Sequence, residues 1–430
     1  MAIARSLLVL MGDGVAGVLV RSPGGSLAFE YDESYRTGPG ATPLSVSMPL
    51  QRRVHPHRVV EPWLWGLLPD NARVLDAWAR RYHVSSSNPF SLLGSPVGED
   101  CPGAVRVIDA ERLDALVGTG PGDDDIAWLT EEDVAGRIRD LVTNTTSWLG
   151  SEGTGRFSLA GAQPKTALVL RDGRWGDPQG ATATTHILKP AVQGLDEHDL
   201  NEHLCLAAMR VIGIPAVRTA VQRFGDQSAV VVRRYDRRQM TAEAVQRIHQ
   251  EDLAQALGHH PTTKYQNEGG PGVADVARLL RSVETADESV VDVESFVRAL
   301  VWNWIIAGTD AHAKNYALLL SGSQVALAPF YDVASALPYP DMPVQKLRFA
   351  MKFGTGYRVN PGSPPWSRLA ADTGLSPGRV VEIAGELVER AADAFATVAA
   401  MPEVTALGSD LPGRLAGLVE ARTRICRALL

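Results

Sequence analysis

Gly308-Thr-Asp-Ala-His-Ala-Lys-Asn315 is the stretch that decides how this chain can fold and act. Residues 292–307 immediately before it place apolar side chains at helical spacing, and we expect this helix to end at Gly308. Asp310 is therefore expected in a loop that directly follows a packed helix.

A predicted hairpin follows this loop. Residues 316–320 and 324–328 form two candidate strands around the turn Ser321-Gly322-Ser323. The return strand leads into Tyr331-Asp332, so we expect Asp332 to lie beside the loop that carries Asp310.

Three oxygen-bearing side chains in this region have the layout of a phosphoryl-transfer site. Protein kinases use a base Asp, a metal-binding Asn five residues later, and a second metal-binding Asp farther along the chain. Asp310, Asn315 and Asp332 match those positions. We expect Asp310 to orient and deprotonate an acceptor hydroxyl, and Asn315 and Asp332 to hold Mg²⁺, which accepts a few oxygen ligands. His312 and Lys314 lie between them and would shape the electric field of the loop, so His312 is counted with Asp310 as catalytic.

Length and composition indicate an ordinary globular protein. A chain of 430 residues is long enough for two or three domains, and 45% hydrophobic with 21% charged residues is typical of soluble proteins. The net charge of −7 argues against a free-standing DNA-binding protein, because phosphate contacts need a concentrated basic face. A local basic patch or a basic partner is compatible with this charge.

Cysteine use and hydropathy indicate a cytoplasmic protein. Cys101, Cys205 and Cys426 lie far apart and match neither a disulfide framework nor a metal-binding spacing. The apolar run at residues 7–11 is too short for the core of a signal peptide, and no run approaches the ~20 residues of a membrane span. We therefore expect a cytoplasmic location and no membrane contact.

Four consecutive regions are predicted along the chain. They are a β-rich N-terminal domain, a linker with a helix, a β-rich lobe with one helix, and a mostly helical lobe, over residues 1–115, 116–148, 149–240 and 241–430. The Gly- and Asp-rich linker is placed at residues 118–125. A capping box of Thr130 and Asp133 predicts a helix over residues 131–148, and apolar spacing predicts another over residues 199–212.

A nucleotide site also needs a phosphate-covering loop and a lysine on a strand. The small-residue segment at 157–165 precedes a predicted strand, where such a loop belongs, although it matches neither GxGxxG nor the P-loop pattern. Lys189 ends the predicted strand 185–189, from which it can reach the α- and β-phosphates. Glu202 on the next helix is a candidate partner for Lys189, as in protein kinases.

Several longer motifs follow one another along nearly the whole chain. The N-terminal region contains Phe29-Glu-Tyr-Asp32, Pro43-Leu-Ser45, Gly66-Leu-Leu-Pro69 and Gly103-Ala-Val105. The rest contains Ser158-Leu-Ala-Gly-Ala-Gln-Pro-Lys-Thr166, His186-Ile-Leu-Lys-Pro190, Asn201-Glu-His-Leu-Cys205, Arg247-Ile-His-Gln-Glu-Asp252, Lys264-Tyr265 with Gly269-Gly-Pro-Gly272, and Asp310-Ala-His-Ala-Lys-Asn315. In these motifs and their order the chain resembles the HipA family of bacterial toxin serine/threonine kinases.

The resemblance implies an α+β, two-lobed protein-kinase-like fold with a β-rich N-terminal domain and a mostly helical C-terminal lobe. With ATP and Mg²⁺ as cofactors, it implies that the phosphates contact Ala160, Gly161, Ala162, Gln163 and Lys165. It further implies that Lys189 contacts the nucleotide, that Arg233 and Tyr235 contact the adenine through backbone groups, and that Asp236 supports this hinge. Ser158 matches the family's autophosphorylated serine, where a phosphate adds nearly two negative charges.

The resemblance also implies a biological role. The chain would be the toxin of a toxin–antitoxin pair and would phosphorylate a translation component, such as an aminoacyl-tRNA synthetase. A HipB-like helix-turn-helix antitoxin would neutralise it, and operator DNA would be bound mainly through that antitoxin.

Two other interpretations stay open at this point. The chain could be a catalytically weak kinase-like regulator that binds ATP and a DNA-binding antitoxin. It could also be a metal-dependent phosphohydrolase that uses Asp310, His312 and Asp332 with His259 or His260. The phosphohydrolase interpretation explains neither Lys189 nor the loop around residue 158.

Overall fold

The computed structural model of the chain describes residues 5–113, 125–149, 156–179, 182–241, 244–360 and 363–430. The chain packs as two compact units, each assembled from three separate segments. Unit 1 comprises Met1–Pro190, Gln222–Thr262 and Leu318–Val325, and unit 2 comprises Ala191–Val221, Thr263–Ala317 and Ala326–Leu430. The α+β class expected from the sequence is confirmed. The four-region division stays a prediction, and the linker placed at 118–125 lies outside the described residues except for its last position.

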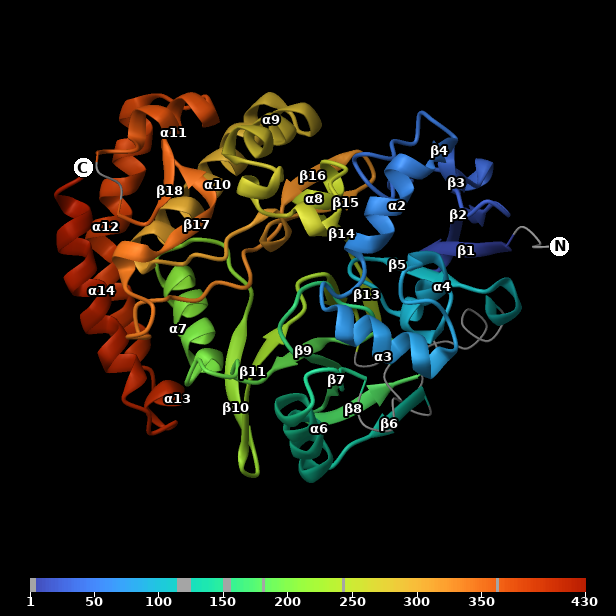
Figure 1. Cartoon of the computed structure of the whole chain (residues 1–430), viewed down its shortest axis with the longest axis horizontal. Helices are drawn as coiled ribbons and strands as arrows, with labels where there is room; N and C mark the ends of the chain where they lie inside the picture. The colour runs from blue at the N-terminus through green and yellow to red at the C-terminus, as the bar shows by residue number, and fades with distance from the viewer. Residues whose placement is uncertain (1–4, 114–124, 150–155, 180–181, 242–243, 361–362) are drawn as a thin grey trace. The chain divides into compact units, whose positions relative to one another are not determined.

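Unit 1 begins with an antiparallel five-stranded sheet of order β4-β3-β2-β1-β5 (Figure 1). Its strands are β1 (Arg5–Met11), β2 (Gly14–Arg21), β3 (Leu27–Tyr31), β4 (Val54–Pro56) and β5 (Val105–Ile108). Alternate residues of β3 point into the core, so that Leu27, Phe29 and Tyr31 are buried. The helices α1 (Glu33–Arg36), α2 (His57–Gly66), α3 (Ala72–Tyr82) and α4 (Pro89–Leu93) complete this part.

A six-stranded sheet of order β10-β11-β9-β7-β8-β6 follows. Its strands are β6 (Ile126–Trp128), β7 (Thr166–Arg171), β8 (Arg174–Pro178), β9 (His186–Lys189), β10 (Thr219–Phe224) and β11 (Gln227–Arg233). Helix α6 (Glu131–Thr143) covers it through a buried cluster that includes Val134, Ile138 and Leu188. The edge strand β6 was not expected from the sequence.

Helix α6 begins as predicted and ends early. The capping box of Thr130 and Asp133 is present, with both reciprocal hydrogen bonds formed. The helix stops at Thr143 and does not reach residue 148. Asn144 turns the chain there, because its Oδ1 accepts hydrogen bonds from the backbone and hydroxyl of Thr146.

Three short strands and two further pairs complete the sheets. Strands β14 (His249–Asp252), β15 (Ala317–Ser321) and β16 (Gln324–Leu327) form one sheet, which confirms the hairpin predicted around residues 321–323. The remaining pairs are β12 (Arg237–Gln239) with β13 (Val245–Arg247), and β17 (Arg348–Phe353) with β18 (Gly356–Arg358). Asp252 caps α8 (Leu253–Ala256) through a capping box with Gln255.

Glu251 of unit 1 is fully buried, and this burial raises its pKa to about 8. Its Oε1 accepts a hydrogen bond from the backbone N–H of Val46, at 2.7 Å. The folded state therefore holds a proton that the unfolded state releases above about pH 4.3. The stabilising contribution of protonated Glu251 is therefore complete below about pH 4.3. It is lost as the pH rises through about 8.

The change Glu251→Gln should therefore stabilise the protein in alkaline solution. We expect the free energy of unfolding to rise by roughly 2–4 kcal/mol at pH 8.5 and to change little at pH 5. Denaturant unfolding at both pH values measures this difference, with the exposed Glu111→Gln as matched control. An equal effect of Glu251→Gln at both pH values would contradict the assignment.

Unit 2 is mostly helical (Figure 1). Its helices are α7 (His198–Val211), α9 (Val273–Val283), α10 (Ala286–Ile306), α11 (Trp366–Thr373), α12 (Pro377–Ala399), α13 (Pro402–Thr405) and α14 (Leu411–Arg427). Helices α10, α12 and α14 pack on one another, and α7 packs on α12 and α14. Helix α10 starts six residues before its predicted bound, at a capping box between Thr285 and Glu288. Its buried Trp302 stacks on Phe395 with 5.6 Å between ring centroids.

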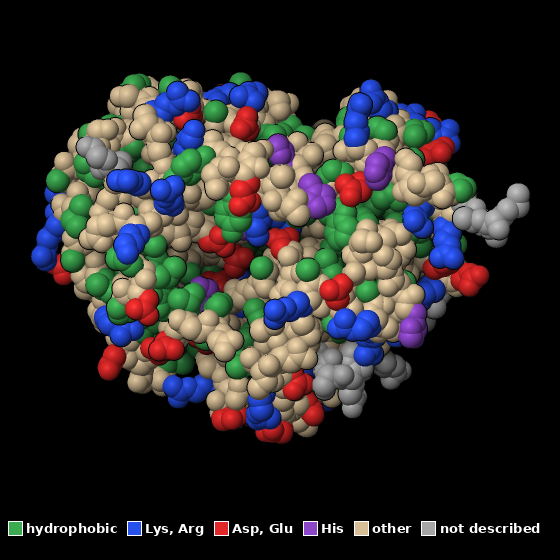
Figure 2. All heavy atoms as spheres, viewed as in Figure 1, with side chains coloured by type: hydrophobic (Ala, Val, Ile, Leu, Met, Phe, Trp, Pro, Cys, Tyr) green, Lys and Arg blue, Asp and Glu red, His purple; other side chains and the backbone are tan. Residues whose placement is uncertain are grey.

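Acidic and basic side chains are interspersed on the face shown in Figure 2. Among the described residues, none of the helices combines the length and the apolar character needed to cross a membrane.

Candidate active site

The loop that carries Asp310 begins where α10 ends. Ala307, not Gly308, takes the left-handed conformation at the helix C-cap, with φ 54°. Gly308 is needed for a different reason: a Cβ at this position would lie 2.3 Å from Oδ1 of Asn303. The N–H of Gly308 donates to the carbonyl of Asn303 at 2.8 Å, so the chain turns tightly against the helix. The predicted end of the helix is confirmed, and the close approach explains the glycine.

Asp310 is held from three sides, and its side chain is 69% exposed. The hydroxyl of Tyr265 donates to Oδ1 of Asp310 at 2.8 Å. The amide of Asn315 donates to the backbone carbonyl of Asp310 at 2.6 Å. The ring of buried His312 lies edge-on to Tyr265, and its Nε2 lies 4.0 Å from Oδ2 of Asp310. A carboxylate fixed in this way and open to solvent can receive a proton from a bound hydroxyl.

Asn315 and Asp332 line the same small cavity, of about 10 Å³. This volume is of the order that one water molecule or one small ion needs. Asp332 has φ 57°, a left-handed conformation that costs a non-glycine residue on the order of 1–3 kcal/mol and is common at functional sites. Tyr331 holds the neighbouring backbone by donating its hydroxyl to the carbonyl of Lys314 at 2.8 Å. Asn315 and Asp332 thus lie at one cavity, and their role as metal ligands stays a prediction.

These two residues offer oxygen ligands of the kind that Mg²⁺ prefers. The Nδ2 group of Asn315 is engaged by the loop, which leaves its Oδ1 as the available ligand atom. The carboxylate of Asp332 supplies the second oxygen. Among the described residues, His, Cys, Asp and Glu side chains form no group of three or more that could hold a metal. The phosphohydrolase interpretation therefore gains no metal cluster from the described part of the chain.

Helix α7 fixes the segment that follows Asp332. Asn201 both donates to the carbonyl of Ser335, at 2.7 Å, and accepts from its N–H, at 3.1 Å. The hydroxyl of Ser335 in turn donates to the carbonyl of Ile306 at 2.6 Å, at the end of α10. Asn201 thus joins the Asp332 segment to α7, and Ser335 joins it to the end of α10, the helix from which the Asp310 loop emerges.

The predicted phosphate-covering segment lies in unit 1 and is tightly folded. The ammonium of Lys165 donates to the carbonyl of Ala160 at 2.7 Å and lies 5.2 Å from the centroid of the Trp148 ring. Gly161 has φ 102°, and a Cβ there would lie 2.6 Å from Nζ of Lys165. Glycine is therefore required for the lysine to close over the loop. The amide of Gln163 donates to the carbonyl of Pro190 at 3.2 Å and joins the loop to the end of β9.

Ser158 is fully buried in this segment. Its hydroxyl donates to the carbonyl of Leu67 at 2.5 Å, and its N–H donates to the carbonyl of Asp100 at 2.9 Å. A phosphoryl group cannot be added to a side chain in this position. The segment around Ser158 must open before the predicted modification takes place.

Lys189 and Arg233 lie at the ends of two paired strands. Lys189 closes β9 opposite Val230 of β11, and Arg233 closes β11 opposite His186 of β9. Lys189 is buried, whereas the Arg233 side chain is exposed. Glu202 belongs to unit 2, so its pairing with Lys189 stays a prediction.

Tyr235 and Asp236 follow β11. The hydroxyl of Tyr235 donates to Oε1 of Gln250 at 2.8 Å. Buried Asp236 accepts from the N–H of Gly103 at 2.7 Å and from Arg234 at 2.8 Å. Asp236 thus anchors the backbone after β11 to Gly103, and its support of the adenine-binding segment stays a prediction.

A second buried carboxylate, Asp100, extends this network. It accepts hydrogen bonds from Arg237 at 2.8 Å, from Arg247 at 3.2 Å and from Arg234 at 3.3 Å. Burial alone would raise its pKa, but the three guanidinium groups hold that pKa well below the usual range of an aspartate. The hydroxyl of Thr184 completes the set at 2.5 Å. None of the sequence motifs predicted this network.

Three comparisons with known proteins agree with the geometry. Residues 157–395 match the family model of the HipA-like C-terminal domain, and residues 7–108 match that of the HipA N-terminal domain. Y4mE of Sinorhizobium fredii, a protein that is named as a kinase, is 33% identical to this chain over 397 residues, which cover 92% of each chain. The serine/threonine-protein kinase toxin HipA of Shewanella oneidensis is 28% identical over 359 residues, which cover 80% of this chain and 79% of that one.

A solved structure shows the same fold. It contains the Shewanella oneidensis toxin–antitoxin system of HipA, HipB and its operator DNA, and its matched chain superposes with a TM-score of 0.81 at 23% identity. The match covers 97% of this chain and 96% of that chain, so the two-lobed kinase-like fold implied by the sequence motifs is confirmed. By its family models, its relatives and its fold, this chain belongs to the HipA family of serine/threonine protein kinases.

Proposed function

We propose that this chain is an ATP- and Mg²⁺-dependent kinase that acts in the cytoplasm as the toxin of a toxin–antitoxin pair. The observation that carries the proposal is the Asp310 loop of unit 2. It presents an exposed, hydrogen-bonded carboxylate, and Asn315 from the same loop shares a cavity with Asp332. Membership of a family of serine/threonine kinases fits this chemistry.

Each residue has one task in the proposed reaction. Asp310 orients the acceptor serine or threonine hydroxyl and takes its proton as the new O–P bond forms. The bond between the γ-phosphorus and the bridging oxygen breaks, and ADP leaves. Asn315 and Asp332 would hold Mg²⁺ through their side-chain oxygens, and the ion would supply positive charge to the phosphates.

The residues of unit 1 serve the nucleotide in this proposal. Backbone groups of Ala160, Gly161, Ala162 and Gln163 surround the phosphates together with Lys165 and Lys189. Arg233 and Tyr235 present backbone groups to the adenine, and Asp236 fixes that segment through Gly103. Lysine ammonium groups at these positions counter the negative charge that ATP brings.

The relatives support a proposal for the partners of this chain. One solved relative is assembled with HipB and operator DNA. We propose that this chain likewise binds a HipB-like helix-turn-helix antitoxin and meets operator DNA mainly through it, in keeping with a net charge of −7. The proposed substrate is a component of translation such as an aminoacyl-tRNA synthetase.

Autophosphorylation tests the proposal directly. With γ-labelled ATP and Mg²⁺, we expect label on Ser158 of the wild type, located by mass spectrometry, and a loss of about tenfold or more in Ser158→Ala. Incorporation should be slow, because the buried hydroxyl must first leave the carbonyl of Leu67.

A matched control separates loss of the acceptor from loss of a buried hydrogen bond. Ser95 is also a buried serine of unit 1, and its hydroxyl donates to the carbonyl of Leu92 at 2.6 Å. Ser95→Ala should keep the label. Unchanged incorporation in Ser158→Ala would remove Ser158 from this role, and ATP binding without any label would favour the weak-kinase regulator instead.

A further inference from the structure

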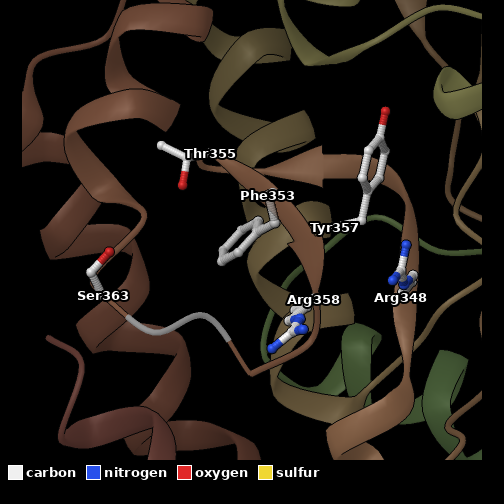
Figure 3. A pocket seen from close by; sticks show the side chains of 7 residues that line it. Arg348, Phe353, Thr355, Tyr357, Arg358 and Ser363 are labelled. Atoms are coloured by element: carbon white, nitrogen blue, oxygen red, sulfur yellow. The ribbon is translucent and has the colours of Figure 1, made fainter.

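The β17–β18 hairpin of unit 2 carries a pocket of about 310 Å³, called here the hairpin pocket (Figure 3). Its lining includes Arg348, Phe353, Thr355, Tyr357, Arg358 and Ser363. A space of this size accepts one or two amino-acid side chains and lies at the lower end of the range for ligand pockets.

Two arginines lie directly opposite each other in this hairpin, and no acidic side chain among the described residues pairs with either. Arg348 and Arg358 are directly paired in the register of β17 and β18, and both side chains are exposed. Like charges directly opposite on neighbouring strands destabilise a sheet. In the part of the chain that the structure describes, neither guanidinium forms an ion pair or a side-chain hydrogen bond. Lys352 adds a third positive charge, 5.6 Å from the centroid of the Tyr357 ring. An anion bound in the pocket would convert this repulsion into attraction.

The other lining residues suit a short side chain that ends in a carboxylate. Figure 3 shows the hydroxyls of Thr355 and Ser363 on one side of Phe353, with Arg348 and Tyr357 on the other side. Guanidinium and hydroxyl groups donate to a carboxylate, and bidentate arginine contacts are among the strongest of this kind. Buried Phe353 supplies an apolar surface for the methylene groups of the same side chain.

The hairpin pocket has a rigid base. Phe353 stacks on Trp304 of α10 with 5.7 Å between centroids and meets Trp366 of α11 at 5.9 Å. Arg422 of α14 donates to the carbonyl of Val359, directly after β18, at 2.9 Å. The arginines of the pocket are therefore presented by strands that packing and hydrogen bonds hold in place.

The same hairpin is tied to the loop that carries the proposed base. The N–H of Ala350 in β17 donates to the carbonyl of Thr309, the residue before Asp310, at 3.1 Å. The N–H of Lys352 donates to Oε1 of Gln266, the residue after Tyr265, at 2.7 Å. A polypeptide whose hydroxyl reaches Asp310 therefore meets β17 among its first neighbours in unit 2.

We propose that the hairpin pocket binds an acidic segment, rich in Asp or Glu, of the protein that the kinase phosphorylates. The identity of this partner rests on the proposed kinase function. A polypeptide fits better than a nucleic acid, because a nucleic acid needs a row of basic groups along its backbone. The pocket offers two guanidinium groups around one concave space.

Binding of labelled peptides in the absence of ATP tests this site. The probes are a fluorescein-labelled peptide with one Ser among Glu residues, the same peptide with Gln in place of Glu, and a single-stranded oligonucleotide. We expect the wild type to bind the Glu peptide about tenfold or more tightly than the Gln peptide, measured by fluorescence anisotropy. The double variant R348Q/R358Q should lose that preference.

The control removes the same charge elsewhere in unit 2. Arg414 and Arg427 are exposed on α14, outside the hairpin pocket, so R414Q/R427Q should keep the preference for the Glu peptide. The charge-reversed R348E/R358E should instead prefer a Lys-containing peptide. This gain of a new preference would show that the variant is folded and that the pocket selects peptides by the sign of their charge.

Three results would overturn the proposal. They are equal binding of the Glu and Gln peptides by the wild type, equal loss of preference in both double variants, and loss of oligonucleotide binding alone in R348Q/R358Q. Because the assay contains no ATP, it is independent of phosphoryl transfer. A chain that binds the acidic peptide but incorporates no phosphate from γ-labelled ATP would refute the kinase proposal. The hairpin pocket would still stand as a site for acidic peptides.

Discussion

Asp310→Asn is expected to lower the rate of phosphoryl transfer by about 10²–10⁴-fold. Asparagine has nearly the same shape as aspartate, and its Oδ1 can still accept the hydroxyl of Tyr265 that now donates to Asp310. The backbone carbonyl of residue 310 still receives the amide of Asn315. The substitution therefore preserves the loop and removes only the group that accepts a proton.

The kinetic signature should be a fall in kcat with little change in the affinity for ATP. Single-turnover transfer with γ-labelled ATP measures the first quantity, and binding of a fluorescent ATP analogue with Mg²⁺ measures the second. Asp341→Asn is the matched control, because Asp341 is another exposed aspartate of unit 2. Activity retained in Asp310→Asn would show that another group accepts the proton.

The elements around this site were predictable because they depend on neighbours in sequence. The helix before Asp310, the hairpin after it and the capping box of α6 all follow from patterns within a few residues. The fixed offset between Asp310 and Asn315 is equally local. Such features require only periodicity and spacing to be recognised.

The supporting contacts were not predictable, because they join residues far apart in the chain. Tyr265 reaches Asp310 across 45 positions, and Asn201 reaches Ser335 across 134. The left-handed backbone at Asp332 also has no sequence signature, since glycine is the residue that this conformation favours and aspartate adopts it only at isolated positions. A tyrosine or an asparagine in a loop or helix acquires its task only from the tertiary structure.

Asp100→Ala is expected to cost about 3–5 kcal/mol in the free energy of unfolding of unit 1. Asp100 is buried, and three arginines with buried side chains, Arg234, Arg237 and Arg247, donate to it. Its removal leaves these positive charges close together, with Asp236 still paired to Arg234 and Arg237. These guanidinium groups have already lost their hydration water in the folded state. Without Asp100, their uncompensated charge therefore lowers stability far more than the loss of one surface ion pair does.

Urea denaturation followed by tryptophan fluorescence measures this loss. The control is Asp226→Ala, which breaks the exposed ion pair between Asp226 and Arg139, 3.0 Å apart, and should change the midpoint little. A small effect of Asp100→Ala would mean that water or a shifted side chain compensates the arginines. If the full loss is observed, the pairing of Asp100 with arginines more than 130 positions away is a main determinant of how the two parts of unit 1 assemble. The same network holds Asp236 in the position proposed to support the nucleotide, so stability and function would fail together.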